Sequence, residues 1–400
     1  MRKSILIALT LIALPMSAMA QLIPLLPSGS KNELWLDPNR IYDYNQYEKS
    51  RWGLGLQYDI NFDTVSKPTF KTLSLSAYGA YGYADQHFKW GVFADLQGAS
   101  RKQSHTYIEF FHDLTADASR TLFTPTLAIL RSPASFMSRL FSDTYRFTLG
   151  FSNRPTKNLF ESIELRLSRE RLLHDDYGEI FYPTYSELKD LEAYNFAELL
   201  LTLFHVSGWS GRVTFGAYNT DNDKDGDVFL RTQVEYNREI RYNFLELQIF
   251  GQGGLVGGTR VPYSRMFDLG GSWGCPLSLN HTLLTARPNE FTASLFAMVN
   301  MKLTTREPLF EYYNNIIALG TAPSPFILCN GAWGLTFDDS YHSPTKGIAE
   351  VGAGIDGLLV WGMVDWGIGV VYRLTPASAD YHLTDPKDNF TLLFTASLEM

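Results

Sequence analysis

The sequence predicts an all-β fold, a transmembrane antiparallel β-barrel of about sixteen strands, with fourteen as the alternative. Apolar and polar residues alternate with a period of two along nearly the whole chain, as they do in strands with two different faces. The alternating runs reach about ten to fourteen residues, which exceeds a typical sandwich strand and suits a tilted strand that crosses a bilayer. After the first 20 residues, no window of the sequence holds about 18 uninterrupted apolar residues, so we expect no transmembrane helix.

The N-terminus has the features of a secretory signal peptide. Arg2 and Lys3 precede an apolar stretch, and the residues from Ala18 to Ala20 form a cleavage site of the A-x-A type. The stretch is too short to span a membrane as a helix, and an uncleaved anchor is the alternative. We therefore divide the chain into a signal peptide at 1–20, an N-terminal segment with the expected first strand at 21–48, and an outer-membrane barrel at 49–400.

Composition narrows the classes of protein. Hydrophobic residues make up 45% of the chain and aromatic residues 14%, which is rich for a secreted soluble protein. The formal net charge is −8, and it approaches −10 once Arg2 and Lys3 are removed, because 32 basic residues then face 42 acidic ones. Such a charge argues against a nucleic-acid partner. Cys275 and Cys329 offer one disulfide at most, and we expect no cofactor.

Fifteen segments carry the alternation, and we expect a strand in each. In chain order they are 51–61, 70–84, 86–98, 103–113, 144–152, 158–170, 194–206, 210–219, 227–238, 242–256, 290–305, 325–338, 346–360, 362–374 and 388–400. The first has Trp52, Leu54, Leu56, Tyr58 and Ile60 on one face, and the last has Phe390, Leu392, Phe394, Ala396, Leu398 and Met400. Because bacterial single-chain barrels usually have an even number of strands, we expect one more within 33–46.

The second face of these strands carries glycine, threonine, glutamine and charged residues. In a barrel this face lines a polar lumen, where opposite charges can pair. The charged residues predicted to line it are Glu109, Arg146, Glu164, Arg166, Arg231, Glu235, Glu246, Lys302, Glu350 and Arg373.

The lengths of the connections predict which end of the barrel faces outward. The long connections are 114–143, 171–193, 257–289 and 375–387, and the short ones are 99–102, 153–157, 207–209 and 239–241. Long extracellular loops and short periplasmic turns are typical of these barrels. The exception is 306–324, which is long and yet falls on the periplasmic side.

An aromatic hairpin is expected at the outer interface. Tyr81 and Tyr83 lie on the apolar face of one strand and Phe88 and Trp90 on that of the next, with the turn at 85–86. Aromatic rings gather at membrane–water interfaces. We therefore predict that these four residues form part of an aromatic girdle.

Four patches of this sequence are similar to the barrel domain of the BamA-like (surface antigen D15-like) superfamily. They are 45–48 with 52–55, 81–83 with Asp85 and 88–89, 261–263 with 289–291, and Glu350 with 354–355, 364–365 and 372–373. The pattern most resembles a Bacteroidetes barrel family of unknown function, often fused to a carboxypeptidase-regulatory-like domain. The resemblance implies sixteen strands with a large loop between the eleventh and the twelfth, where 257–289 falls.

The sequence departs from the protein-inserting branch of that superfamily in two respects. The loop at 257–289 lacks the Arg-Gly-aromatic motif, and residues 21–48 leave no room for a periplasmic POTRA repeat. The chain also ends in Met400 instead of an aromatic residue. The missing motif and the missing POTRA repeat argue against protein insertion as the activity.

Two motifs could carry chemistry. Asp221, Asp223 and Asp225 match the first half of a calcium loop, but Thr232 stands where a bidentate glutamate belongs, so an acidic hairpin is the alternative. Ser272 lies in a G-x-S-x-G sequence, but no helix is expected after it, so a glycine-rich plug or lid loop is the alternative.

Other candidates are weaker. The glycines at 251–254 lack the register of a phosphate loop. His174 could bind a surface cation, and a solvated loop is the alternative. Ser104 and His105 would point to opposite faces of a strand and could not act together.

We expect a protein that is not an enzyme, in the outer membrane of a Gram-negative bacterium. The leading hypothesis is a scaffold or a translocation or assembly component that contacts outer-membrane lipids and protein partners, with loop 257–289 folded into or over the lumen. The alternatives are a passive porin-like channel and a hydrolase with its site at the outer rim.

Overall fold

The computed structural model describes most of the predicted barrel. The described residues are 23–25, 32–37, 41–45, 49–62, 70–99, 104–116, 141–152, 160–173, 193–223, 225–268, 283–286, 292–305, 323–337, 347–361, 364–375 and 389–398. No helix in this part of the chain is long and apolar enough to cross a membrane. The described residues form an all-β structure with a single 3-10 turn, at Tyr263–Arg265.

One antiparallel sheet contains the barrel strands. They are β2 (Asn32–Asp37), β3 (Tyr42–Asn45), β4 (Lys49–Asn61), β5 (Phe70–Gly82), β6 (Phe88–Gly98), β7 (His105–Ala116), β8 (Phe141–Ser152), β9 (Phe160–Leu172), β10 (Tyr194–Val206), β11 (Trp209–Thr220), β12 (Asp227–Tyr242), β13 (Leu245–Gly258), β16 (Leu295–Thr305), β17 (Ser324–Leu335), β18 (Gly347–Trp361), β19 (Val364–Arg373) and β20 (Phe390–Leu398). The sheet has 18 segments, which include the short β1 (Ile23–Pro24) and count β2 and β3 separately. Since β2 and β3 pair with opposite ends of β4, they occupy one position, and the predicted sixteen strands are confirmed.

The first strand position is the one that the sequence left least defined. It was expected within 33–46, and β2 and β3 together extend from Asn32 to Asn45. Asp37 pairs with Gly55 and Tyr42 pairs with Trp52, so the two segments pair with successive stretches of β4.

The described turns among those predicted to be periplasmic are tight. β10 and β11 are joined by Ser207 and Gly208, both with positive φ, as a two-residue hairpin requires. The turn predicted at 239–241 was misplaced, because β12 continues to Tyr242 and Asn243 takes the positive φ. Asparagine tolerates this left-handed conformation, whereas 239–241 lies within the ladder that pairs with β13.

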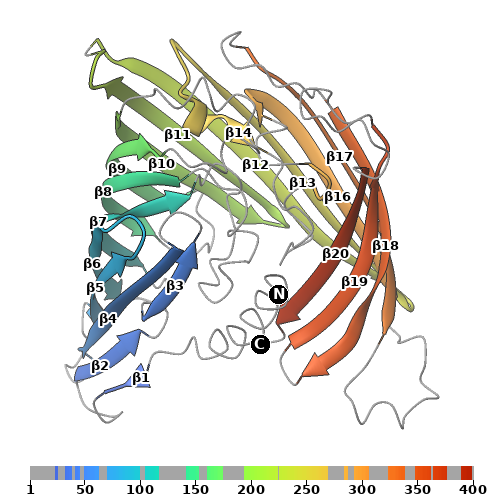
Figure 1. The fold of residues 1–400 in the computed structure, drawn as a ribbon, viewed down its shortest axis with the longest axis horizontal. Coiled ribbons are helices and arrows are strands. Elements are labelled where there is room, and N and C mark those ends of the chain that lie inside the picture. The colour runs from blue at the N-terminus through green and yellow to red at the C-terminus, as the bar shows by residue number, and fades with distance from the viewer. Residues whose placement is uncertain are drawn as a thin grey trace.

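The sheet curves around a central space, from β2–β4 on one side to β18–β20 on the other (Figure 1). Every strand position pairs with its neighbours in chain order, and the β12–β13 hairpin is the longest. Within the described residues β20 pairs with β19, and no ladder joins it to β1, β2, β3 or β4. The closed ladder that a lipid-exposed sheet requires is therefore not completed by the described residues.

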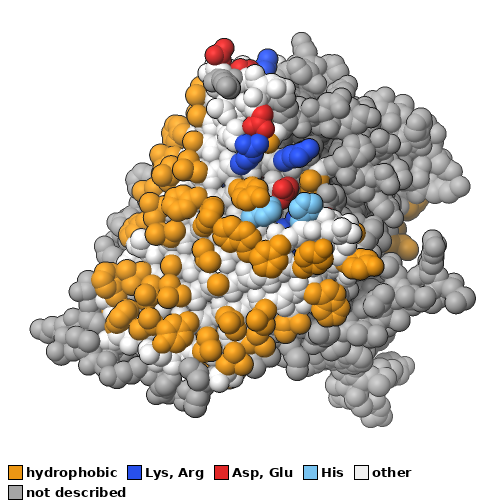
Figure 2. All heavy atoms as spheres, turned by 60° about the vertical axis from the view of Figure 1, so that its left-hand side comes forward, with side chains coloured by type: hydrophobic (Ala, Val, Ile, Leu, Met, Phe, Trp, Pro, Cys, Tyr) orange, Lys and Arg blue, Asp and Glu red, His pale blue; other side chains and the backbone are white. Residues whose placement is uncertain are grey.

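The outer face of the sheet is apolar. On β9 the outward side chains of Ile163, Leu165 and Leu167 are 41–45% exposed, whereas the inward Ser168 and Glu170 are 7% exposed. Figure 2 shows hydrophobic side chains spread over the outer surface of the N-terminal half of the sheet. A soluble protein would bury such a surface, and in a transmembrane barrel it faces lipid. The described strands thus have the architecture of an outer-membrane β-barrel, and the predicted location is confirmed.

The inward face differs from the expectation of a polar lumen. On β10 to β13 it carries Phe196, Tyr218, Phe229 and Phe250, each at most 5% exposed. These rings belong to a core that also includes residues of the connection between β13 and β16. The expectation was incomplete because alternation shows which residues share a face, and it cannot show that a distant loop will cover that face.

Candidate functional site

The connection between β13 and β16 comprises residues 259–294, and its described parts, 259–268, 283–286 and 292–294, fold back against the inward face of the sheet. Its described parts contain the 3-10 turn at Tyr263–Arg265 and β14 (Phe267–Asp268), which pairs with β15 (Thr292–Ala293). Met266 and Phe267 are each 1% exposed. We call residues 259–294 the lumenal loop. It lies between the eleventh and twelfth strand positions, where the sequence placed the large loop.

Arg265 attaches this loop to the wall of the barrel. Its guanidinium donates to Glu198 from Nε at 2.7 Å and from Nη2 at 3.1 Å, and to Glu170 from Nη1 at 3.0 Å and from Nη2 at 2.9 Å. The side chains are 14%, 4% and 8% exposed for Arg265, Glu198 and Glu170. Burial disfavours the charged guanidinium, but the two carboxylates outweigh burial and raise the pKa of Arg265 above its ordinary value. A fork shared by two buried carboxylates fixes both the position and the direction of the turn.

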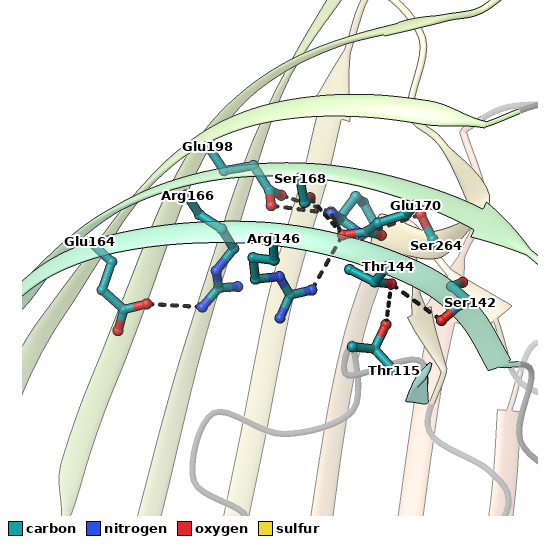
Figure 3. A network of polar contacts seen from close by, with 11 residues as sticks. Thr115, Ser142, Thr144, Arg146, Glu164, Arg166, Ser168, Glu170, Glu198 and Ser264 are labelled. Carbon is teal, nitrogen blue, oxygen red and sulfur yellow. Dashed lines mark hydrogen bonds and ion pairs between the residues drawn. The ribbon is translucent and has the colours of Figure 1, made fainter. Parts of the chain in front are cut away.

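The network continues along β8 and β9. Glu170 also accepts from Ser168 Oγ at 2.8 Å and from Arg146 Nη2 at 3.3 Å. Figure 3 shows Glu198 and Glu170 converging on one point from neighbouring strands, with Arg146 and Arg166 along the same wall. Further along β9, Arg166 donates to Glu164 at 2.9 Å. The wall of β8 and β9 therefore carries both carboxylates and guanidinium groups, which pair with one another. The guanidinium of Arg265 from the loop joins this network at Glu170.

A second attachment involves Glu350 on β18, which is 0% exposed. Its carboxylate accepts from the backbone N–H of Leu284 at 2.9 Å and of Thr285 at 2.6 Å, from the Thr285 hydroxyl at 2.5 Å, and from Asn330 Nδ2 at 3.1 Å. Arg373 stands directly opposite Glu350 in the ladder and is 1% exposed. The loop is thus held at two places, on opposite parts of the barrel wall.

Between these attachments, apolar side chains of the loop pack on the sheet. A Cβ added to Gly254 would lie 2.6 Å from Phe267 Cζ and 2.7 Å from Phe296 Cε1. Only glycine therefore leaves room for the loop ring at this position of β13. Arg231 places its guanidinium 4.3 Å from the centroid of the Phe267 ring. Gly254, one of the glycines at 251–254, thus serves the packing of the loop.

The charged residues predicted to line the lumen lie on the inward face of their strands. Besides those described above, Glu109 stands beside Thr148, Glu235 accepts from Gln233 at 3.2 Å, and Glu246 accepts from Gln248 at 2.9 Å. Lys302 donates to Asp356 at 2.5 Å. The structure thus uses part of this set to hold the loop and part for pairs within the wall.

The predicted girdle residues face outward. Tyr81, Tyr83 and Phe88 are 49%, 73% and 58% exposed, and Trp90 contacts Phe110 edge to face at 5.0 Å. Gln86, in the turn between them, has a φ of 56°.

The three candidate calcium ligands do not converge. Asp221 pairs with Arg169 at 2.8 Å, and Asp223 lies 3.9 Å from Arg260. The described residues, which include Asp225, contain no group of three side chains that could hold a metal ion. Ser272, His174 and Cys275 lie outside the described residues, and Cys329 is a free, exposed cysteine on β17.

Sequence reasoning missed Arg265, Glu170, Glu198 and Thr285. A signal existed for Glu170, because it shares the inward parity of Glu164 on the same strand, β9. Arg265 stands before Met266 and Phe267, and a cation directly beside apolar residues in a long loop favours a buried attachment. The sequence analysis did not single out Arg265, because methionine follows it and it therefore forms no Arg-Gly-aromatic motif.

Comparisons with known proteins give likeness of fold only. No family model matches the chain, and no curated protein matches it. Among solved structures, BamA from Haemophilus ducreyi lacking POTRA domains 1–3 aligns at 8% identity over 96% of this chain and 76% of that chain, with a TM-score of 0.48. CdiB from Acinetobacter baumannii aligns at 8% identity over 92% of this chain and 60% of that one, with a TM-score of 0.43. The outer membrane protein opdK from Pseudomonas aeruginosa aligns at 10% identity over 92% and 97%, with a TM-score of 0.29. Likeness at this level carries no information on function.

Proposed function

We propose that this chain is an outer-membrane barrel of the BamA-like superfamily that acts as a membrane scaffold or as a component of a translocation or assembly machine, with its lumenal loop as a closing element. The sixteen strand positions and the inward loop after the eleventh support this assignment. The sequence patches that resemble the superfamily include Glu350 and Arg373, which lie together behind the loop.

The observation that carries the proposal is the double attachment of the loop. Arg265 bonds Glu170 and Glu198, and Glu350 bonds the backbone at 284–285. A loop held by charges that are almost fully buried is a fixed part of the barrel and would obstruct passive flow. A scaffold or a gated component tolerates a closed lumen, whereas a general porin does not.

A passive channel is the second candidate, and one observation favours it. The inward face of β4 to β7 carries small and polar residues, among them Gln57, Ser74, Asp95 and Glu109, which are only partly buried. This sector of the wall is suited to contact with water. A channel along it would have its selectivity set by these charges.

Planar-bilayer recording separates the two candidates. Wild-type protein should pass little current if the loop closes the lumen, and deletion of residues 265–280 should produce open, long-lived steps. Ion-selective steps of similar size in both proteins would favour the channel and remove the closing role of the loop. Affinity purification in mild detergent then tests for protein partners of the intact barrel.

A further inference from the structure

The outward face of β8 to β11 changes from apolar to basic at the rim where the lumenal loop begins. One cross-strand row consists of Phe147, Leu167, Ala197 and Ala217, and the next row outward consists of Tyr145, Arg169, Asn195 and Asn219. Arg171 lies one row farther out, opposite Asp143. The two arginines share their face of β9 with Leu165 and Leu167, which are 42% and 45% exposed. They therefore stand directly beyond the apolar surface, at the level of lipid headgroups.

The neighbours of these arginines leave them available. Arg169 bonds Asp221 at 2.8 Å, but both side chains are about half exposed, at 54% and 44%, and such surface pairs are weak. Within the described part of the chain, Arg171 has an exposed side chain and no ion-pair partner. Asp143, the acid opposite it, accepts from His112 at 2.7 Å. The two nearby acids thus already have partners: Asp143 bonds His112, and Asp221 pairs weakly with Arg169.

The polar side chains around the arginines form an ordered surface. His112 stacks on Tyr145 with ring centroids 3.9 Å apart and an angle of 2° between the planes. Asn195 donates to Asn219 at 3.0 Å in the same row as Arg169. Figure 2 shows basic, acidic and histidine side chains gathered near one end of the apolar outer surface.

The corresponding rim of β4 to β6 has a different character. Trp52, Tyr81 and Phe88 are exposed there, at 61%, 49% and 58%, in place of arginines. The basic rim is therefore a local feature of β9 and not a general property of the barrel edge.

We propose that Arg169 and Arg171 bind the phosphate group of a phosphorylated glycolipid in the outer leaflet. A guanidinium matches phosphate geometry with paired N–H donors, and it binds phosphate through charge-assisted hydrogen bonds. The phosphate displaces Asp221 from Arg169, and the lipid chains lie over the apolar rows formed by Phe147 and Leu167. The site depends on the outer-membrane location and on the predicted outward orientation of this rim, and it does not depend on the role of the lumenal loop.

Native mass spectrometry of the full-length protein in detergent tests the proposal. Wild-type protein should retain bis-phosphorylated lipid A, while the same lipid without phosphates should be lost. The R169Q/R171Q double variant should bind the phosphorylated lipid about 30-fold more weakly, as expected for the loss of two surface cations. The matched control is Arg238→Gln, an exposed arginine on the outward face at the other end of β12, which should bind as wild type.

Two outcomes would overturn the proposal. The first is equal retention of phosphorylated and dephosphorylated lipid, or an equal loss in the double variant and the control. The second is that inorganic phosphate alone, at the same concentration as the lipid, is retained by the wild-type protein and lost by the double variant. That result would indicate a site for free phosphate. Heat-modifiable mobility in gels checks that each variant is folded, so that loss of lipid cannot reflect loss of the barrel.

Discussion

Removal of Arg265 should release the first attachment of the lumenal loop by a measurable amount. The guanidinium makes four hydrogen bonds of 2.7–3.1 Å to Glu170 and Glu198. Arg265→Met leaves both carboxylates buried without their partner, and breaking a buried pair from one side costs about 3–5 kcal/mol. At about 1.4 kcal/mol per factor of ten, the population of the released turn should rise about a hundredfold to a few thousandfold.

Current through planar bilayers and limited proteolysis of the loop measure this release. Arg265→Met should increase both the open time of the barrel and the rate of cleavage within 259–268. The control is Arg260→Met in the same loop. The side chain of this arginine is 67% exposed, and its contact with Asp223 is long, at 3.9 Å, so its removal should cost little. Adding Glu170→Gln and Glu198→Gln to Arg265→Met should recover stability without restoring the attachment. Current and cleavage equal to wild type in Arg265→Met would refute the reasoning.

Three further changes have defined outcomes. Glu350→Gln weakens the charge-assisted bonds to the two loop amides that it accepts from, so their hydrogen exchange should speed up at least tenfold, and unchanged exchange would contradict the second attachment. Gly254→Val places a Cβ 2.6 Å from Phe267 and should cost about 1–3 kcal/mol of loop packing, seen as faster proteolysis, while Gly257→Val, with open space at its Cβ, should not. Trp90→Asp puts a charge on the lipid-facing side and should reduce heat-modifiable, folded protein, and a wild-type gel shift would count against a girdle role.

The period of the sequence was sufficient to predict the wall of the barrel. Alternation identified the outward residues, such as Leu165 and Leu167 on β9, because lipid requires apolar side chains at every second position. Strand ends were less certain. The turn after β12 depends on the single residue Asn243, and no apolar pattern distinguishes a strand end from a tight turn a few residues away.

The loop attachments could not be read from the sequence in the same way. Arg265 meets partners 67 and 95 residues away, and such contacts depend on the curvature that brings β9 and β10 opposite the loop. Parity alone places Glu170 and Glu198 on the inward face, and it leaves open whether water, a neighbour on the wall or a loop pairs with them. The bulky residues Phe196 and Phe229 on that same face were the remaining sign that something covers it.

The distribution of inward residues links the loop to the function of the barrel. Strands β10 to β13 present buried aromatic rings to the loop, whereas the inward face of β4 to β7 includes polar residues that are only partly buried, such as Gln57 and Asp95. Release of the loop would therefore break the ion pairs of Arg265 and would also expose Phe196, Phe229 and Phe250 to water, at about 25 cal/mol for each Å² of apolar surface. The loss of the ion pairs and the exposure of the apolar rings both oppose spontaneous opening. A partner that presents its own apolar surface would cover the rings and remove the second cost. This coupling is the physical basis of the closing role that we propose for the loop.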